Sequence, residues 1–528
     1  MVDKRFKRLD LRFEQSLYLI SFFLYLMNVS LKAQVYHLPN DYFFDLISQR
    51  QLAKIDSEQI HSGIKPYIPF LNKKYEFVPD SYRIFKYISD DQLIDKIFFH
   101  HLIHIKSKTK EYEFKIDPLL NVETGRENYD TIKSSKIYTN TRGFLASGSI
   151  GKKFYFESLF AENQSQFPNY ISNFNNKTLI VPGQGRYKVF KTTAYDYAFS
   201  SGFISYQVAK KLNIQLGHGK QKIGNGYRSL LLSDNSFNYP YLRLTSEWWK
   251  GKLQYSNIYG VLMNLTTGGA ATPANTEHLF QKKAVSFHYL SYNVHKRINV
   301  GLFQGMVWTA ADSMNRHHIT WQYVNPILFT NLGFYGLNRS NNMLIGTTVN
   351  FKLSNKLSVY GHFMGDDFSH KSSLGNLFGY QAGLIYYDAC LIKNLTLQAE
   401  YNDVAEGTYR NPKGVYTDQS YTHYNQNLGY IFSYGKELVI LADYKYKRAF
   451  LNSKINLQWL TLNQVRLYEN TIVKLQVGYT VNPAYNLNIS FGYQFRKQDY
   501  SKSNGLNNVA NYYTISLKTS LYNAYYDF

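Results

Sequence analysis

Apolar and polar residues alternate along most of the chain from about residue 111 onward. In 485–496 every odd position is apolar or aromatic, from Tyr485 to Phe495, and every even position is polar or glycine. A period of two predicts β-strands with one face in an apolar environment and one in water. The same alternation occurs at 394–402, 436–447, 452–459 and 471–481. We therefore expect strands that face lipid on one side and an aqueous lumen on the other.

Further strands of the same kind are predicted at 111–120, 142–150, 153–162, 194–207, 211–219, 239–248, 251–262, 284–292, 296–307, 343–353, 356–365 and 377–388. A weaker segment lies at 421–433. With the final segment of the chain the total comes to about 18, and an even number is expected of a transmembrane barrel. The predicted fold class is an all-β membrane protein, an antiparallel transmembrane β-barrel of about 18 strands with a small helical N-terminal periplasmic segment.

The charges on the strands agree with this register. Lys445, Lys454, Lys474 and Arg496 all fall on the polar face. A basic side chain on the lipid face at mid-depth would cost about 2–4 kcal/mol. We expect all four to point into the lumen.

The last residues also alternate, with Tyr522, Ala524, Tyr526 and Phe528 on one parity. We expect them to form the final strand, which closes the barrel against 111–120, since an open edge is not stable in lipid. Tyr526 and Phe528 are the candidate closure and insertion residues. The preceding apolar positions have the other parity, which predicts a β-bulge near 519–521.

The first part of the chain reads differently. A basic start, an apolar stretch at 17–27 and a small residue at Ala33 predict a signal peptide over 1–33. Residues 34–110 contain helical spacing at 41–55 and 91–105, and we expect a partly helical periplasmic segment there. The barrel, with internal or extracellular loops, is expected over 111–528.

Composition and charge narrow the class further. Aromatic residues make up 17% of the chain, as expected if they form interfacial girdles. No run of about 18 apolar residues exists to form a helical span. The net charge is +22, and removal of 1–33 leaves +19. Such a charge suits lipopolysaccharide phosphates or an acidic surface polysaccharide, whereas a membrane barrel is not expected to bind nucleic acid.

Function is expected in the long connections at 163–192, 220–238, 264–283, 308–342 and 405–420. One group combines basic residues, which pair with acidic sugars, and aromatic residues, which stack on sugar rings. The alternative interpretation is an interfacial aromatic girdle beside ordinary loop charges. The candidate glycan-contact residues are Lys220, Lys222, Tyr227, Arg228, Arg243, Trp248 and Trp249.

The chain offers little for catalysis or cofactors. The glycines at Gly224 and Gly226 lack the third glycine of a dinucleotide fingerprint. His100 and His104 have helical spacing but no further ligand completes a metal set. The single cysteine, Cys390, excludes an intramolecular disulfide. We expect no catalytic residue, no cofactor and no metal, and hence no enzyme.

Three segments resemble the capsule-assembly Wzi family and its Bacteroidetes relatives, the gliding-motility RemB proteins. They are 116–120 (IDPLL), 218–236 (HGKQKIGNGYRSLLLSDNS), and 323–329 (YVNPILF) followed by 340–346 (SNNMLIG). The resemblance implies an internally plugged outer-membrane barrel with a small helical periplasmic part. For the Wzi branch it implies surface polysaccharide binding, and for the RemB branch a role in gliding.

Three functions therefore stay open: a cell-surface barrel of gliding motility or adhesion, a capsule or exopolysaccharide anchor, and a diffusion porin. The expected partners are outer-membrane lipid and lipopolysaccharide, acidic surface polysaccharide, the outer-membrane assembly machinery, and proteins of a gliding or secretion apparatus.

Overall fold

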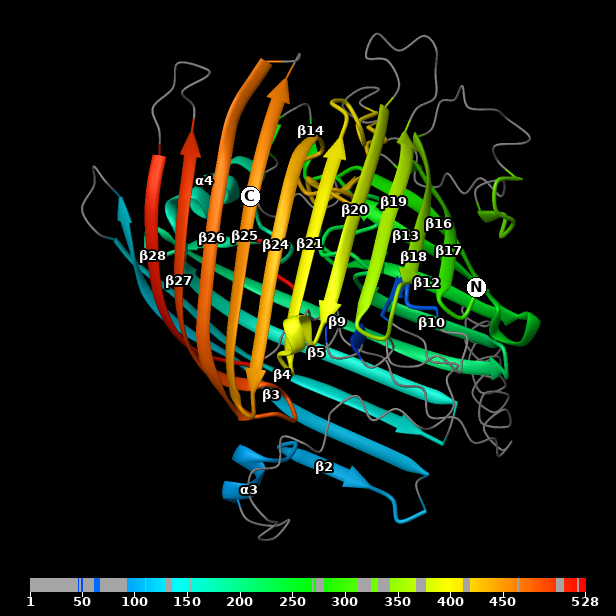
Figure 1. Cartoon of the computed structure of the whole chain (residues 1–528), viewed down its shortest axis with the longest axis horizontal. Helices are drawn as coiled ribbons and strands as arrows, with labels where there is room; N and C mark the ends of the chain where they lie inside the picture. The colour runs from blue at the N-terminus through cyan, green and yellow to red at the C-terminus, as the bar shows by residue number, and fades with distance from the viewer. Residues whose placement is uncertain are drawn as a thin grey trace, which may run out of the picture.

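The computed structural model is a closed barrel of 18 antiparallel strands (Figure 1). The structure describes residues 46, 49–50, 61–66, 93–109, 111–129, 135–151, 153–267, 270–271, 280–311, 324–330, 342–366, 377–411, 418–462, 465–499, 508–519 and 522–528. The predicted signal peptide (1–33) and most of the predicted helix at 41–55 lie outside these residues. In the described part of the chain no helix is long and apolar enough to cross a membrane.

The wall strands follow one another in chain order, and each pairs with the next. They are β3 (Tyr112–Tyr129), β4 (Ser135–Ile150), β5 (Phe154–Gln166), β9 (Ala194–Ala209), β10 (Leu212–Gly219), β12 (Tyr239–Trp248), β13 (Leu253–Met263), β16 (Lys282–His295), β17 (Ile298–Ala311), β18 (Asn342–Lys352), β19 (Leu357–Asp366), β20 (Leu377–Tyr387), β21 (Leu395–Val404), β24 (Gly435–Tyr446), β25 (Ala449–Leu462), β26 (Val465–Asn482), β27 (Leu487–Asp499) and β28 (Asn508–Lys518). The predicted fold class and strand number are confirmed, except that 421–433 is not a wall strand.

The two ends of the barrel differ in their connections. Tight turns join β9 to β10 and β24 to β25 at one end, whereas the other end carries the long connections. The tight-turn end also carries α3 (Leu93–Phe98) and β2 (Ile103–Lys106), the latter paired with the start of β3 (Figure 1). Because barrels place short turns in the periplasm and long loops outside, we refer to these as the periplasmic and extracellular ends.

The alternating apolar and polar residues of the strands face opposite sides of the wall, as expected. Val477, Phe491 and Ile515 project outward and remain about half exposed, at 50%, 49% and 60%, as side chains that face lipid would. On the inner face Lys454 contacts Asp527, and the Arg496 guanidinium donates to the Phe528 carbonyl oxygen. The predicted lumenal orientation of the strand lysines and of Arg496 is confirmed.

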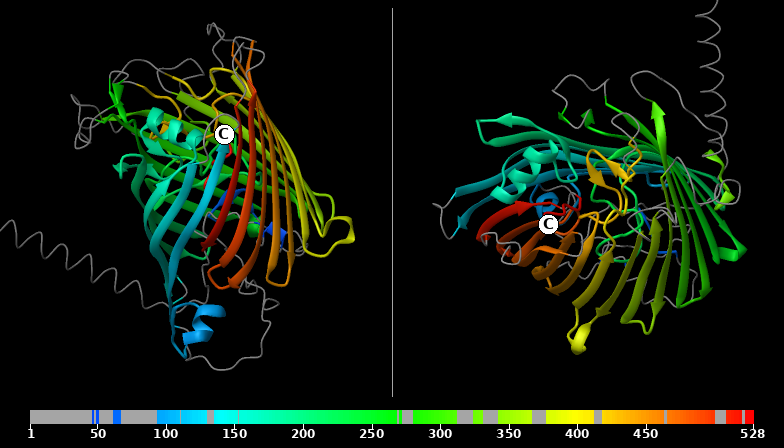
Figure 2. Two further views of the ribbon diagram at one scale, coloured as in Figure 1. Left: turned by 90° about the vertical axis from the view of Figure 1, so that its left-hand side faces the viewer. Right: turned by 90° about the horizontal axis from the view of Figure 1, so that it is seen from above.

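The prediction that the last residues, 522–528, form the closing strand is wrong. Closure is made by β28, in which Leu517 pairs with Val122 of β3. After Lys518 the chain leaves the wall, and 522–528 turns back into the lumen without regular structure (Figure 2). Tyr526 and Phe528 therefore take no part in closure. Their alternating pattern is explained by packing on lumenal aromatics, since Phe528 lies 4.7 Å from Phe174, ring centre to ring centre.

The N-terminal region also departs from expectation. Within the predicted helix at 91–105, only α3 is helical, and 103–106 is a strand. Ile64 and Lys65 form β1, which lies in the lumen and pairs with β11 (Lys222–Ile223). This stretch of the predicted periplasmic segment is thus part of the barrel interior.

One stretch of the outer wall is not apolar. Asn257 of β13, His288 of β16 and Gln304 of β17 face outward in the middle of their strands, yet each is at most 4% exposed. The segment 324–330 covers them. The Asn257 amide donates to the Pro326 carbonyl oxygen at 2.9 Å, and the Phe329 N–H donates to Gln304 at 2.7 Å. This part of the predicted loop 308–342 therefore lies against the outside of the barrel, where it satisfies polar groups that lipid could not.

Candidate functional site in the barrel lumen

Four segments fill the middle of the lumen, and together we call them the plug. They are 61–66, 220–238, 522–528, and the described part of 405–434, which omits 412–417. The plug has an apolar core of its own. Leu230, Leu231 and Tyr421 are at most 1% exposed and pack against inward-facing wall residues. The Tyr421 hydroxyl donates to the Leu231 carbonyl oxygen at 2.8 Å, which joins two of the segments. The helix α4 (Asn169–Thr178) lies toward the extracellular end (Figure 2).

Arg243 of β12 joins the first two plug segments to the wall. Its side chain is fully buried, and Nη1 donates to the Pro66 carbonyl oxygen at 2.9 Å and to Gln221 at 3.0 Å. A guanidinium offers several donors in a fixed plane, so one side chain can serve two backbone segments at once.

A buried ion-pair cluster connects the loop 220–238, the tail 522–528 and the wall. Arg228 donates from Nε and Nη2 to the two carboxylate oxygens of Glu437 in β24, at 2.9 and 2.8 Å. Arg228 Nη2 also lies 3.2 Å from a carboxylate oxygen of Asp527, and Lys454 of β25 lies 2.9 Å from the same oxygen. Two cations and two anions thus neutralise one another in the lumen. We call these four residues the latch.

The electrostatics favour the charged form of the latch. Burial by itself raises the pKa of the Asp527 carboxyl, but Arg228 and Lys454 outweigh that effect, and the net pKa lies well below its usual range. The Tyr227 hydroxyl adds a hydrogen bond of 2.7 Å to the carboxylate. Such a cluster is costly to break, because removing one member leaves a buried charge without its partner.

Glu400 of β21 fixes the turn that presents Arg228. Its carboxylate accepts the backbone N–H of Tyr227 at 2.6 Å, the N–H of Arg228 at 3.0 Å and the hydroxyl of Tyr360 at 2.8 Å. The adjacent Gly226 has no room for a side chain, since a Cβ atom there would lie 2.4 Å from Glu400.

The carboxylate of Asp234 holds the tail at a second place, nearer to its beginning than Asp527. Asp234 accepts from the Asn523 amide and the Tyr525 hydroxyl, both at 2.8 Å. Burial raises the pKa of Asp234, but Lys222 and Lys220 lower it by more, so the net pKa is below its usual value. Burial lowers the pKa of Lys220 to about 8, against the opposing effect of Asp234.

The predicted glycan-contact residues do not form one group. Lys220, Lys222, Tyr227, Arg228 and Arg243 lie in the lumen and are at most 8% exposed. Trp248 and Trp249 lie at the periplasmic end of β12 and are 56% and 66% exposed. The separation follows from position along β12, since Arg243 points into the lumen from the middle of the strand whereas the two tryptophans lie at its periplasmic end. Glycan contact by these residues stays a prediction, and the burial of five of them argues against it.

Sequence reasoning missed the acidic residues around Arg228, which are Glu437 and Asp527 of the latch and Glu400 beside it. Glu437 and Glu400 have the parity of lumen-facing residues on their strands, and Asp527 lies in the tail that was interpreted as a strand. A buried arginine needs anionic partners, so inward-facing acids on the strands were the available signal. The described residues contain no group of three His, Cys, Asp or Glu side chains placed to hold a metal ion.

Comparison with known proteins agrees at the level of fold. No protein-family model matches the chain, and no curated protein matches it in sequence. Among solved structures, the chain is similar to Wzi of Escherichia coli, described as an outer-membrane protein involved in group 1 capsule assembly and a carbohydrate-binding β-barrel. The TM-score is 0.54 at 11% identity, over 93% of this chain and 100% of that one.

Porins give lower scores. A BenF-like porin of Pseudomonas fluorescens has a TM-score of 0.43 at 10% identity, over 77% of this chain and 99% of that one. OccAB2 of Acinetobacter baumannii has a TM-score of 0.42 at 12% identity, over 76% and 97%. The closed barrel of 18 strands and the likeness to Wzi, not these lower-scoring porins, show that the chain has the fold of an outer-membrane β-barrel.

Proposed function

We propose that this chain is an integral outer-membrane protein that binds acidic polysaccharide at its extracellular end and is not an open diffusion pore. The barrel fold and its apolar outer face support the location. The plug and its latch support a closed lumen. Two ion pairs, Arg228 with Glu437 and Lys454 with Asp527, hold the plug to the inner face of the wall.

The observation that carries the binding proposal is a basic rim at the extracellular end. Lys177 in the last turn of α4, Lys188 in β8 (Lys188–Phe190) and Lys191 are all exposed. Lys191 Nζ lies 5.1 Å from the centre of the Phe190 ring. Exposed ammonium groups, one of them beside an aromatic ring, suit a chain of acidic sugars, which offers carboxylates and apolar ring faces. The net charge of +22 adds long-range attraction.

The fold likeness to Wzi supports the same substrate class, since that protein is described as a carbohydrate-binding barrel. A role in gliding motility or adhesion stays a prediction on which neither the described contacts nor the comparisons bear. The proposed partners are outer-membrane lipid, lipopolysaccharide and acidic polysaccharide.

The test uses the purified full chain in detergent and alginate immobilised on a surface, with neutral dextran as the comparison. Wild type should bind alginate, and binding should weaken as salt rises, because salt screens exposed charges. Replacing Lys177, Lys188 and Lys191 together by Gln should weaken binding by about tenfold, from about 0.5 kcal/mol for each exposed contact.

A matched control removes three exposed lysines from the periplasmic turns, Lys296, Lys356 and Lys393. The total charge change is the same, so this variant separates the rim from overall charge. Equal loss in both triple variants, or no loss in either, would contradict the assignment to the rim.

A further inference from the structure

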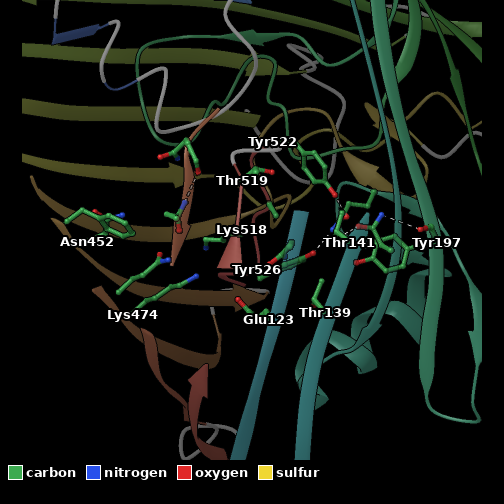
Figure 3. A pocket seen from close by; sticks show the side chains of 18 of the residues that line it. Glu123, Thr139, Thr141, Tyr197, Asn452, Lys474, Lys518, Thr519, Tyr522 and Tyr526 are labelled. Carbon is green, nitrogen blue, oxygen red and sulfur yellow. Dashed lines mark hydrogen bonds between the residues drawn. The ribbon is translucent and has the colours of Figure 1, made fainter. Parts of the chain in front are cut away.

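The lumen contains a cavity of about 330 Å³ on one side of the tail (Figure 3). It lies between the tail and the inner faces of the strands on both sides of the closure, β3, β4, β5 and β9 on one side and β24 to β28 on the other. Asn486 and Lys518 belong to its lining, and both lie at or beside periplasmic ends of strands. The lining also includes Asn163 of β5 and Tyr197 near the extracellular end of β9, so the cavity spans the middle of the lumen and is built from other residues than the basic rim.

The lining combines three kinds of groups. Seven Asn and Gln side chains supply both donors and acceptors, three lysines face one glutamate, and four aromatic rings supply flat apolar surface. Asparagine and glutamine amides match pairs of neighbouring sugar hydroxyls, since each offers a donor and an acceptor. The volume is near the lower end of the range of about 300–1,000 Å³ for small-molecule sites.

Two polar atoms of the lining, Asn488 Oδ1 and Lys474 Nζ, have no hydrogen-bond partner among the described residues. Asn488 is 4% exposed, and among the described residues its Oδ1 atom accepts no hydrogen bond. Lys474 lies beside the cavity, exposed to it, without a hydrogen bond or ion pair to any described residue. An inward lysine without an ion pair to a described residue is a group that a ligand could satisfy, and the Asn488 amide would turn to present its buried Oδ1 atom to a ligand.

The aromatic wall is held in place before any ligand arrives. Gln184 lies between two tail tyrosines, accepting from the Tyr522 hydroxyl and donating to the Tyr526 hydroxyl. The Tyr522 ring stacks on Phe199 at 24° between planes. In Figure 3, Lys474 and Asn452 lie on one side of the cavity and Tyr522 and Tyr197 on the other. A sugar ring between them would have a rigid stacking surface on one side and a charge on the other.

We propose that this cavity binds a small acidic saccharide, with its carboxylate at Lys474, its hydroxyls on the amides and Glu123, and a ring face against Tyr522 or Tyr526. A second cavity, of about 110 Å³, shares Glu123, Thr139, Lys474 and Tyr526 and extends the space toward α4. This site is separate from the basic rim and does not depend on it.

The experiment measures binding of glucuronate, glucose and acetate to the purified full chain by isothermal titration calorimetry. Glucuronate should bind saturably, glucose more weakly, and acetate should not displace glucuronate, because acetate has the charge without the ring. Lys474→Gln should weaken glucuronate binding about tenfold or more, as expected for a charge-assisted hydrogen bond, and should leave glucose binding unchanged.

Two controls keep the outcome decisive. Lys356→Gln, on a periplasmic turn outside the cavity, should bind glucuronate as wild type does. Asn488→Ala should weaken both sugars, and the thermal unfolding of each variant establishes that it is folded. Absence of saturable glucuronate binding, an unchanged affinity in folded Lys474→Gln, or equal displacement by acetate would each overturn the proposal. Alginate binding through the rim should be unaffected by Lys474→Gln, so the two sites can fail independently.

Discussion

Replacing Asp527 by Asn should release the tail from the lumen while leaving the wall intact. The substitution removes the carboxylate that lies 3.2 Å from Arg228 and 2.9 Å from Lys454. Arg228 keeps both hydrogen bonds to Glu437, so the main loss is the ion pair of Lys454. Its side chain is 18% exposed and, among the described residues, keeps the hydrogen bond to the Tyr227 hydroxyl at 2.8 Å. The wall does not depend on this residue, since β28 closes the barrel before the tail begins.

The magnitude follows from the burial of the pair. Removing one partner of a buried ion pair costs about 3–5 kcal/mol, and the partial exposure of Lys454 places this case near the lower figure. Each step of about 1.4 kcal/mol changes an equilibrium constant tenfold, so the equilibrium constant for docking of the tail should fall about a hundredfold. Because cleavage of a briefly opened segment follows its open population, chymotrypsin should cut after Tyr522, Tyr525 or Tyr526 about a hundred times faster.

The assay follows loss of the C-terminal peptide by mass spectrometry during limited chymotrypsin digestion. The control is Asp403→Asn, which removes the same charge from a pair whose lysine, Lys436, is 53% exposed. That exposed pair is worth at most about 1 kcal/mol, and its loss should not change tail cleavage. A cleavage rate in Asp527→Asn equal to that of wild type would refute the latch.

Three further predictions concern the tail, the plug and the wall. The pKa of Asp527 is lowered in the folded state, so its contribution is complete above the unfolded value of about 3.9 and is lost as the pH falls through the folded value; tail cleavage, taken relative to that of an unfolded reference peptide at the same pH, should be constant from about pH 7 to about pH 5, and a rise toward pH 5 would contradict the pairing. Gly226→Ala should loosen the plug and lower the unfolding temperature, because its Cβ would lie 2.4 Å from Glu400, whereas Gly219→Ala, whose Cβ would meet only a ring carbon at 3.7 Å, should be tolerated. Val477→Lys on the outer face should destabilise the barrel in lipid by about 2–4 kcal/mol, and Gln476→Lys on the lumenal face should not; equal effects in a urea unfolding series would mean that the register is wrong.

The wall could be predicted from the sequence because its rule is local. A strand with lipid on one side and water on the other must alternate, so the period of two in 485–496 and its neighbours gave strand number, register and the inward lysines. The same rule failed at the tail. Tyr522 and Tyr526 alternate as a strand would, but their rings face lumenal aromatics, and alternation cannot distinguish a lipid surface from an aromatic-lined lumen.

The plug and the outer seam could not be predicted because they depend on contacts between distant parts of the chain. Arg228 and Asp527 are 299 residues apart, and nothing local pairs them. The loop at 220–238 has a polar and basic composition, and this composition does not distinguish an exposed loop from a buried one. Asn257 and Gln304 break the apolar pattern of the outer face, and only the fold reveals that 324–330 covers them.

The most direct test of a closed barrel is the conductance of the full chain in a planar lipid bilayer. With the plug latched to the wall by Arg228, Glu437, Asp527 and Lys454, we expect near-silence, with no steady open level. A large and steady conductance like that of a diffusion porin would contradict the account.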